Sequence, residues 1–165
     1  MVTLRRYLSL LALLFWQGGF TFYGAVVVPI TRQVLKDHMR LALAAEITGP
    51  VTNGLNWAGV LTLAVLLWDL AVAADASRRR YRLRCGAWAF LFVSLGALFA
   101  LHYVLDKFGP LEGIPEPDQF AFWKVHQSYL VICALQWGAG LTYLGLSLSA
   151  WRSEDQHEAV REKTK

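Results

Sequence analysis

The sequence lacks most of the features by which enzymes and metalloproteins are recognised. Among its 165 residues it has two cysteines, Cys85 and Cys133, which form neither a Cys-x-x-Cys pair nor a cysteine–histidine spacing suited to a metal. We expect the two thiols at different depths of the fold, which disfavours a disulfide between them. The P-loop, Gly-x-Ser-x-Gly, His-Glu-x-x-His and dinucleotide-binding patterns are also missing. These absences favour a protein that is not an enzyme.

Charged residues are also scarce in four long apolar stretches of the chain. Within them the charged residues are Asp69 and Lys124, while 56% of the whole chain is hydrophobic. About 20 apolar residues in a helix are enough to span the hydrocarbon core of a bilayer. We therefore predict an all-α polytopic membrane protein, an antiparallel four-helix transmembrane bundle, with a charged tail over 152–165. The four predicted helices cover about residues 7–30, 52–74, 85–105 and 120–151.

The first stretch raises the alternative of a cleaved signal peptide, because Arg5 and Arg6 precede it. Its apolar run is longer than a typical signal region, and no small-x-small pattern closes it. We expect it to remain as a membrane helix. Residues 31–50 then combine cations at four-residue spacing with apolar positions, which predicts a short amphipathic helix on the membrane surface. Gly49-Pro50 is expected to end this surface helix.

Lysine and arginine are distributed unevenly between the connecting segments. The start, the middle connection and the tail carry 11 of them, and the segments on the other side carry five. The positive-inside rule then places both termini in the cytoplasm of a plasma or inner membrane. This topology explains the net charge of +4 without a nucleic acid partner.

The middle connection is rich in arginine. Such a cluster fixes the orientation of a membrane protein and can bind anionic lipid headgroups, so membrane lipid is a predicted partner. The five arginines are Arg78, Arg79, Arg80, Arg82 and Arg84.

Helices in a bilayer associate through small side chains and shared hydrogen bonds, and each stretch offers such residues. In the fourth, steps of three and four residues predict one bundle-facing stripe of His126, Tyr129, Cys133, Gln136, Gly140, Tyr143 and Ser147. The matching residues on the other stretches are Gln17, Thr21 and Gly24, then Ala58, Thr62, Asp69 and Ala73, and then Ser94, Ala97 and the Gly96–Ala100 pair.

Three polar residues are expected inside the membrane. Gln17 and Gln136 both lie near the middle of their stretches and could bond across the bundle. Asp69 is costly there, by about 2.5–3.5 kcal/mol, and buried acids of this kind often have a function. A protonated Asp69, or one paired with the arginine connection, would be structural. The alternative is that it handles protons or a ligand.

Two histidines provide a second functional hypothesis. His102 and His126 are expected at similar depth near the outer ends of adjacent helices, where they could ligate a haem b iron or a metal ion. His38 in the predicted surface helix could complete a metal site. The alternative is that both rings make interfacial or interhelical hydrogen bonds.

The segment from Gly19-Phe20 through Pro29, followed by Val34-Leu35 and Ala44-Ala45, resembles an uncharacterised family of four-helix membrane proteins, the transmembrane-protein-205-like group. In that group a glycine- and aromatic-rich first helix ends in Val-x-Pro, and a histidine followed closely by serine opens the last helix, as in 126–128 here. The resemblance implies the four-helix architecture and no particular reaction. The chain departs from the group in its arginine-rich connection and in Asp69.

Two function classes follow from these patterns. The favoured one is a non-enzymatic accessory or scaffold component that contacts lipid and either another membrane protein or a second copy of itself. The alternative is a haem- or metal-binding redox or transport component that uses His102 and His126.

Overall fold

The computed structural model of the protein describes residues 2–34, 39–73, 75, 77–108 and 116–163. In these parts the chain is almost entirely helical and forms no strand. The elements in chain order are α1 (Val2–Phe22), the π-helix η1 (Tyr23–Val27), α2 (Val28–Val34), α3 (Met39–Val72), α4 (Arg78–Lys107) and α5 (Glu116–Lys163).

Four helical runs are long and apolar enough to cross a membrane, as the sequence predicts. The first, third and fourth runs extend beyond both predicted ends, where flanking charged residues such as Arg and Lys are good helix formers, whereas the second begins five residues earlier than predicted and ends two residues earlier. The four runs are Val2–Thr31, Ile47–Val72, Arg78–Lys107 and Asp118–His157.

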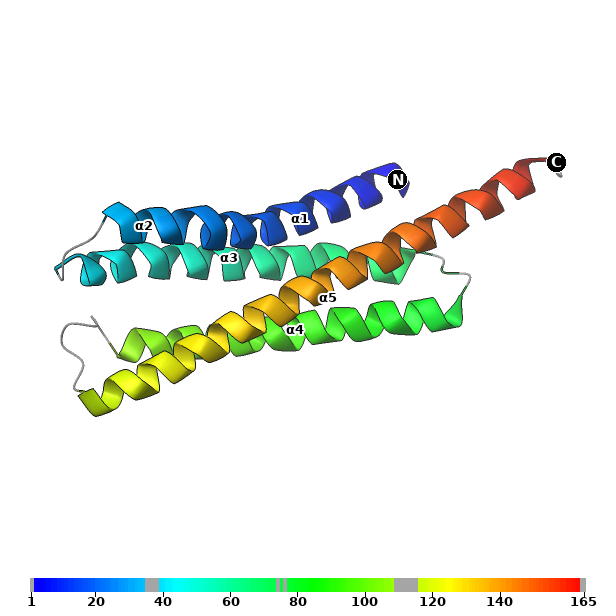
Figure 1. Ribbon diagram of the computed structural model, residues 1–165. Coiled ribbons are helices and arrows are strands. Elements are labelled where there is room, and N and C mark those ends of the chain that lie inside the picture. The colour runs from blue at the N-terminus through cyan, green and yellow to red at the C-terminus, as the bar shows by residue number, and fades with distance from the viewer. Residues whose placement is uncertain (1, 35–38, 74, 76, 109–115, 164–165) are drawn as a thin grey trace.

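The start of α1 and the last part of α5 lie at the same end of the molecule (Figure 1). The end of α3 and the start of α4 also lie there, and we call it the network end after the ion pairs described below. The opposite end holds α2, the start of α3, the end of α4 and the start of α5.

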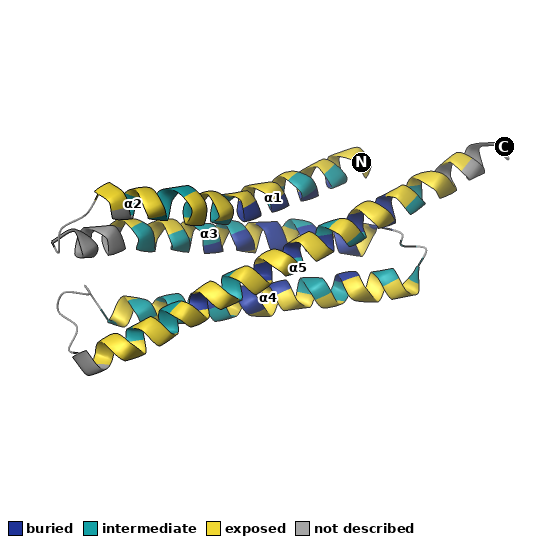
Figure 2. Ribbon diagram, in the orientation of Figure 1, coloured by how far each residue is buried: buried dark blue, intermediate teal, exposed yellow. Residues whose placement is uncertain are grey.

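The apolar core is built from all four long helices. It contains Leu13 and Trp16 of α1, Leu63 and Leu66 of α3, Leu91 and Leu95 of α4, and Tyr143 of α5. Figure 2 shows this buried strip on the facing sides of the helices, with exposed residues over most of the outer surface. Many of those exposed residues are large and apolar, such as Phe15 and Leu61, which are each 71% exposed. A surface of this kind suits lipid rather than water.

The predicted surface helix over 31–50 is wrong as a separate element. α3 begins at Met39 and continues through Gly49 and Pro50 into the second membrane-length helix. Pro50 lacks the N–H that would bond to the carbonyl of residue 46. The Thr52 hydroxyl donates to the carbonyls of Thr48 and Gly49, each at 2.9 Å, in the turn around Pro50. Apolar helices tolerate a proline, and α3 continues through Pro50.

Pro29 is accommodated by a local change of helix type. The Val28 N–H bonds to the carbonyl of Tyr23, five residues earlier, and the turn between them is the π-helix η1. Such a bulge absorbs an extra residue without ending the helix. The first helical run therefore extends to Val34 instead of ending at residue 30.

Burial confirms the predicted stripe on α5 and corrects parts of the other helices. Five residues of the α5 stripe are buried, namely Tyr129, Gln136, Gly140, Tyr143 and Ser147. On α1, Gln17 is buried but Thr21 is exposed, as is Gly24 in η1, since the packed face of α1 lies nearer its start. On α4, Ser94 is buried, whereas the Gly96–Ala100 pair faces outward.

Candidate functional site

Asp69 lies at the centre of a group of charged side chains at the network end. It is 0% exposed. Its Oδ1 is 2.9 Å from Nε of Arg5 on α1 and accepts a hydrogen bond of 3.2 Å from the indole Nε1 of Trp151 on α5. Its Oδ2 accepts a hydrogen bond of 2.6 Å from Nη2 of Arg84 on α4. One carboxylate on α3 thus contacts the other three long helices.

Helical spacing explains why these side chains turn inward. Arg5 precedes the buried Ser9 by four residues, and Arg84 precedes the buried Leu91 by seven, so each cation continues the buried face of its helix. Trp151 follows the buried Ser147 by four residues. Continued beyond Ser147, the alternating steps of the predicted α5 stripe reach the buried Ala150, which precedes Trp151, and then Glu154.

The start of α1 is also joined to the last part of α5. The Glu154 carboxylate receives Nη2 of Arg5 at 2.7 Å and Nη2 of Arg6 at 2.9 Å. Nη1 of Arg6 lies 2.8 Å from the Asp155 carboxylate. The first residues of the predicted charged tail therefore belong to the folded structure.

A second acidic group, Asp75, stands in the connection between α3 and α4. It receives Nε and Nη2 of Arg80 at 2.7–3.1 Å, and it accepts a hydrogen bond of 2.9 Å from the Ser77 N–H. Burial alone would raise the pKa of Asp75, but the hydrogen bonds from Arg80 and Ser77 and the charges of Arg80 and Arg84 outweigh it, so the pKa is lowered. Asp75 is therefore ionised at neutral pH.

Opposite charges are balanced in this ion-pair network. It contains four arginines and four carboxylates, joined by Trp151: Arg5, Arg6, Arg80, Arg84, Asp69, Asp75, Glu154 and Asp155. Removing one partner of such a pair leaves the other charge buried and uncompensated, which is strongly destabilising. Both oxygens of Asp69 are occupied and neither is exposed, so the contacts suit a structural role rather than proton transfer with solvent.

The arginines of the middle connection separate into two groups. Arg84 is 0% exposed and pairs with Asp69, which corrects its assignment to lipid headgroups. Arg80 is half-buried against Asp75. The remaining three are exposed and, among the residues that the structure describes, have no ion-pair partner: Arg78, Arg79 and Arg82.

The predicted hydrogen bond between Gln17 and Gln136 is absent from the described contacts of these two residues. Nε2 of Gln136 donates instead to the hydroxyl of Ser94 on α4 at 3.1 Å. Gln17 lies one turn further along α5, against Gly140, where an added Cβ would come within 2.7 Å of the Gln17 Nε2. Both side chains are buried between the helices, but they lie at different levels along the helix axes.

The two candidate histidines have local contacts at the opposite end. Nε2 of His102 lies 3.6 Å from the Asp106 carboxylate on the same helix. The ring of His126 stacks on Phe122, with centroids 6.0 Å apart, and meets Trp123 edge-on at 5.8 Å. His38 lies outside the described residues. In the described part of the chain, no group of three or more His, Cys, Asp or Glu could hold a metal ion, and the paired-histidine hypothesis remains a prediction.

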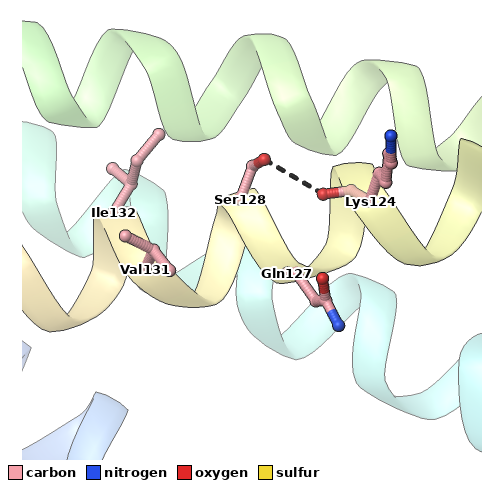
Figure 3. A pocket seen from close by; sticks show the side chains of 5 residues that line it. All are labelled: Lys124, Gln127, Ser128, Val131 and Ile132. Carbon is pink, nitrogen blue, oxygen red and sulfur yellow. Dashed lines mark hydrogen bonds between the residues drawn. The ribbon is translucent and has the colours of Figure 1, made fainter.

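A depression on α5 near His126 has a volume of about 520 Å³. Figure 3 shows that its described lining comes from α5 alone, and that Lys124 and Gln127 point to opposite sides of the helix. The Ser128 hydroxyl is already donated to the Lys124 carbonyl at 3.0 Å. These polar groups do not converge on one point, so the depression is not a built ligand site.

The network is thus the most organised polar site in the described structure, and sequence reasoning found only part of it. The sequence predicts the pairing of Asp69 with the arginine connection as one alternative, but it does not single out Arg5, Trp151 or Glu154 as site residues. The periodicity of α1 and α5 is the signal that points to Arg5 and Glu154. Comparison of the chain with family models, with curated proteins and with solved structures found no match.

Proposed function

We propose that this chain is an integral membrane protein that crosses the bilayer four times as an antiparallel helical bundle, with both termini in the cytoplasm. In this proposal it acts as a non-enzymatic accessory or scaffold component. The network end then lies at the cytoplasmic face, and the exposed apolar side chains contact lipid or another membrane protein.

The ion-pair network is the observation that carries this proposal. Its central carboxylate joins α3 to α1, α4 and α5, and Glu154 adds a second link between α1 and α5. A framework of matched charges whose central members, Asp69, Arg5 and Arg84, are buried holds helices in a fixed arrangement. An enzyme would instead need an accessible acid, base or nucleophile at a concave site.

The apolar exterior supports the membrane location and the choice of partners. Large apolar side chains are exposed along all four long helices, including Phe15, Leu61, Val93 and Leu135, each more than half exposed. Lipid tails cover such surfaces without penalty, and so does the apolar face of a neighbouring membrane helix. Lipid, a second copy of the chain and another membrane protein are therefore the proposed partners.

Membrane insertion and topology are tested together. Extraction of membranes at alkaline pH should leave the protein in the pellet, and a reporter enzyme fused after Lys165 should be active only in the cytoplasm. Recovery in the soluble fraction would overturn the membrane proposal, and an external reporter would overturn the topology alone.

An absorbance spectrum of the detergent-purified protein tests the non-enzymatic scaffold against the redox alternative. The scaffold proposal predicts a colourless protein. A haem absorption band that is lost in His126→Ala and retained in His157→Ala would support the redox alternative instead, because His157 is exposed on the part of α5 beyond the network.

A further inference from the structure

The three exposed arginines near the start of α4 are not equivalent. Arg78 and Arg82 line a shallow groove of about 380 Å³ together with Tyr81 and Asp75. Arg79 is also exposed but does not line it. Residues four apart on a helix are neighbours on its surface, so Arg78 and Arg82 can hold one ligand between them.

The charge of this groove is positive in spite of Asp75. The Asp75 carboxylate is paired with Arg80 and is 1% exposed, so its negative charge is neutralised from within the protein. Neither Arg78 nor Arg82 has an ion-pair partner among the described residues. Two guanidinium groups thus remain to bind an external anion, and guanidinium matches the geometry of a phosphate group.

We propose that this groove binds the headgroup of an anionic glycerophospholipid in the leaflet at the network end. The inference rests on the proposed membrane insertion, because only then does the start of the Arg78–Lys107 span lie at the level of the lipid phosphates. Arg78 and Arg82 hold the phosphate, and Tyr81, which is 41% exposed, places its ring at the boundary between headgroups and acyl chains.

The alternative to a built groove is a diffuse attraction of the whole arginine cluster to a negative surface. Every exposed arginine contributes to that attraction by a similar amount. The alternative therefore predicts equal effects of Arg78, Arg79 and Arg82, whereas the groove predicts that Arg79 differs from the other two.

The experiment measures lipid bound to detergent-purified protein by native mass spectrometry, with equimolar phosphatidylglycerol and phosphatidylcholine of the same chain length. The wild-type chain should retain phosphatidylglycerol preferentially. Arg78→Gln and Arg82→Gln should each reduce this preference about fivefold, as expected for one cation near an anionic lipid, and Arg79→Gln less than twofold. Arg78→Lys should recover part of the loss, because it restores the charge without the planar fork.

Three outcomes would overturn the proposal. They are the absence of a preference for phosphatidylglycerol, an equal loss in all three glutamine variants, and displacement of the lipid by millimolar glycerol phosphate, which would identify a soluble phosphate as the ligand. Circular dichroism of each variant checks that the fold is retained. Alkaline extraction of the same variants reports membrane insertion separately, so failure of the lipid site is distinguishable from failure of the proposed function.

Discussion

The charged side chains at the two ends of the helices differ in the partners that they contact. At the network end, most charged side chains bind partners on another helix, such as Arg5 with Glu154, 149 residues apart, and Arg84 with Asp69, 15 apart, while Arg80 binds Asp75, five residues apart. At the opposite end, three contacts of charged side chains in the described part of the chain join residues four apart on one helix. These are His102 with Asp106, Lys107 with the Tyr103 ring at 4.3 Å, and Lys124 with the Phe120 ring at 4.4 Å.

This difference separates two uses of charge in a helical protein. Long-range pairs exist only when the helices are packed, so they stabilise the tertiary structure. Pairs within one helix form as soon as that helix forms, and they add little to the association of helices. The network end should therefore be sensitive to charge removal, and the opposite end tolerant of it.

Replacing Asp69 should give the largest effect. Asp69→Ala leaves Arg5 and Arg84 buried without their shared partner, and we expect a loss of about 3–5 kcal/mol in the free energy of unfolding. Asp106→Ala at the opposite end should change it by less than about 1 kcal/mol, because that side chain is 62% exposed. Reversible unfolding of both variants in detergent measures the difference. Equal losses would remove the distinction between the two ends.

Packing provides a second comparison, within α3. A Cβ added at Gly59 would lie 2.7 Å from Cε2 and Cζ2 of the buried Trp16, whereas one added at Gly54, nearer the opposite end, meets nothing within 4 Å. Gly59→Ala should destabilise by about 1–3 kcal/mol, because a rigid indole must move. Gly54→Ala should be neutral or slightly stabilising, since alanine favours helix. The thermal unfolding midpoint of Gly59→Ala should be lower than that of Gly54→Ala. A higher midpoint for Gly59→Ala would contradict the close approach of α1 and α3.

The four apolar spans could be predicted from the sequence, whereas most contacts between them could not. Uninterrupted apolar runs fix the four helices, and the three- and four-residue steps of α5 place Tyr129 and Tyr143 on its buried face. Pattern alone could not show that α3 continues through Pro50, because a Gly-Pro pair usually ends a helix.

The network illustrates the same limit. Arg82 and Arg84 stand two residues apart in one basic run, yet one is exposed and the other fully buried. Which of them turns inward depends on the rotation of α4 against α3, and no local property of the basic run encodes this rotation. The pairing of Arg5 with Glu154 likewise requires two segments from opposite ends of the chain to meet.

A single hydrogen bond from Trp151 allows a finer test of the difference between the network end and the opposite end. Trp151→Phe keeps an aromatic ring but removes the Nε1 donor to Asp69, and we expect a loss of about 1.5 kcal/mol, as for a hydrogen bond to a charged group. Trp123→Phe at the opposite end, where the side chain is 47% exposed, serves as the control and should change stability by less than about 0.5 kcal/mol. Chemical denaturation of both variants measures the two losses of stability. A larger loss in Trp123→Phe than in Trp151→Phe would contradict the stabilising role of the hydrogen bond between Trp151 and Asp69.

The smallest effect concerns Asp75, which lies at the edge of the network. Because its pKa is lowered in the folded protein, its stabilising contribution is complete above the pKa of the unfolded chain, near 3.9, and is lost as the pH falls through the lower folded value. The difference in unfolding midpoint between the wild type and Asp75→Asn should therefore be constant from about pH 7 to pH 5 and shrink below about pH 4. Asp106→Asn, whose contact is local and exposed, provides the matched control. If the difference in unfolding midpoint between the wild type and Asp75→Asn grew on acidification, burial would destabilise the Asp75 carboxylate more than Arg80 stabilises it. Asp75 would then not belong to the stabilising ion-pair network.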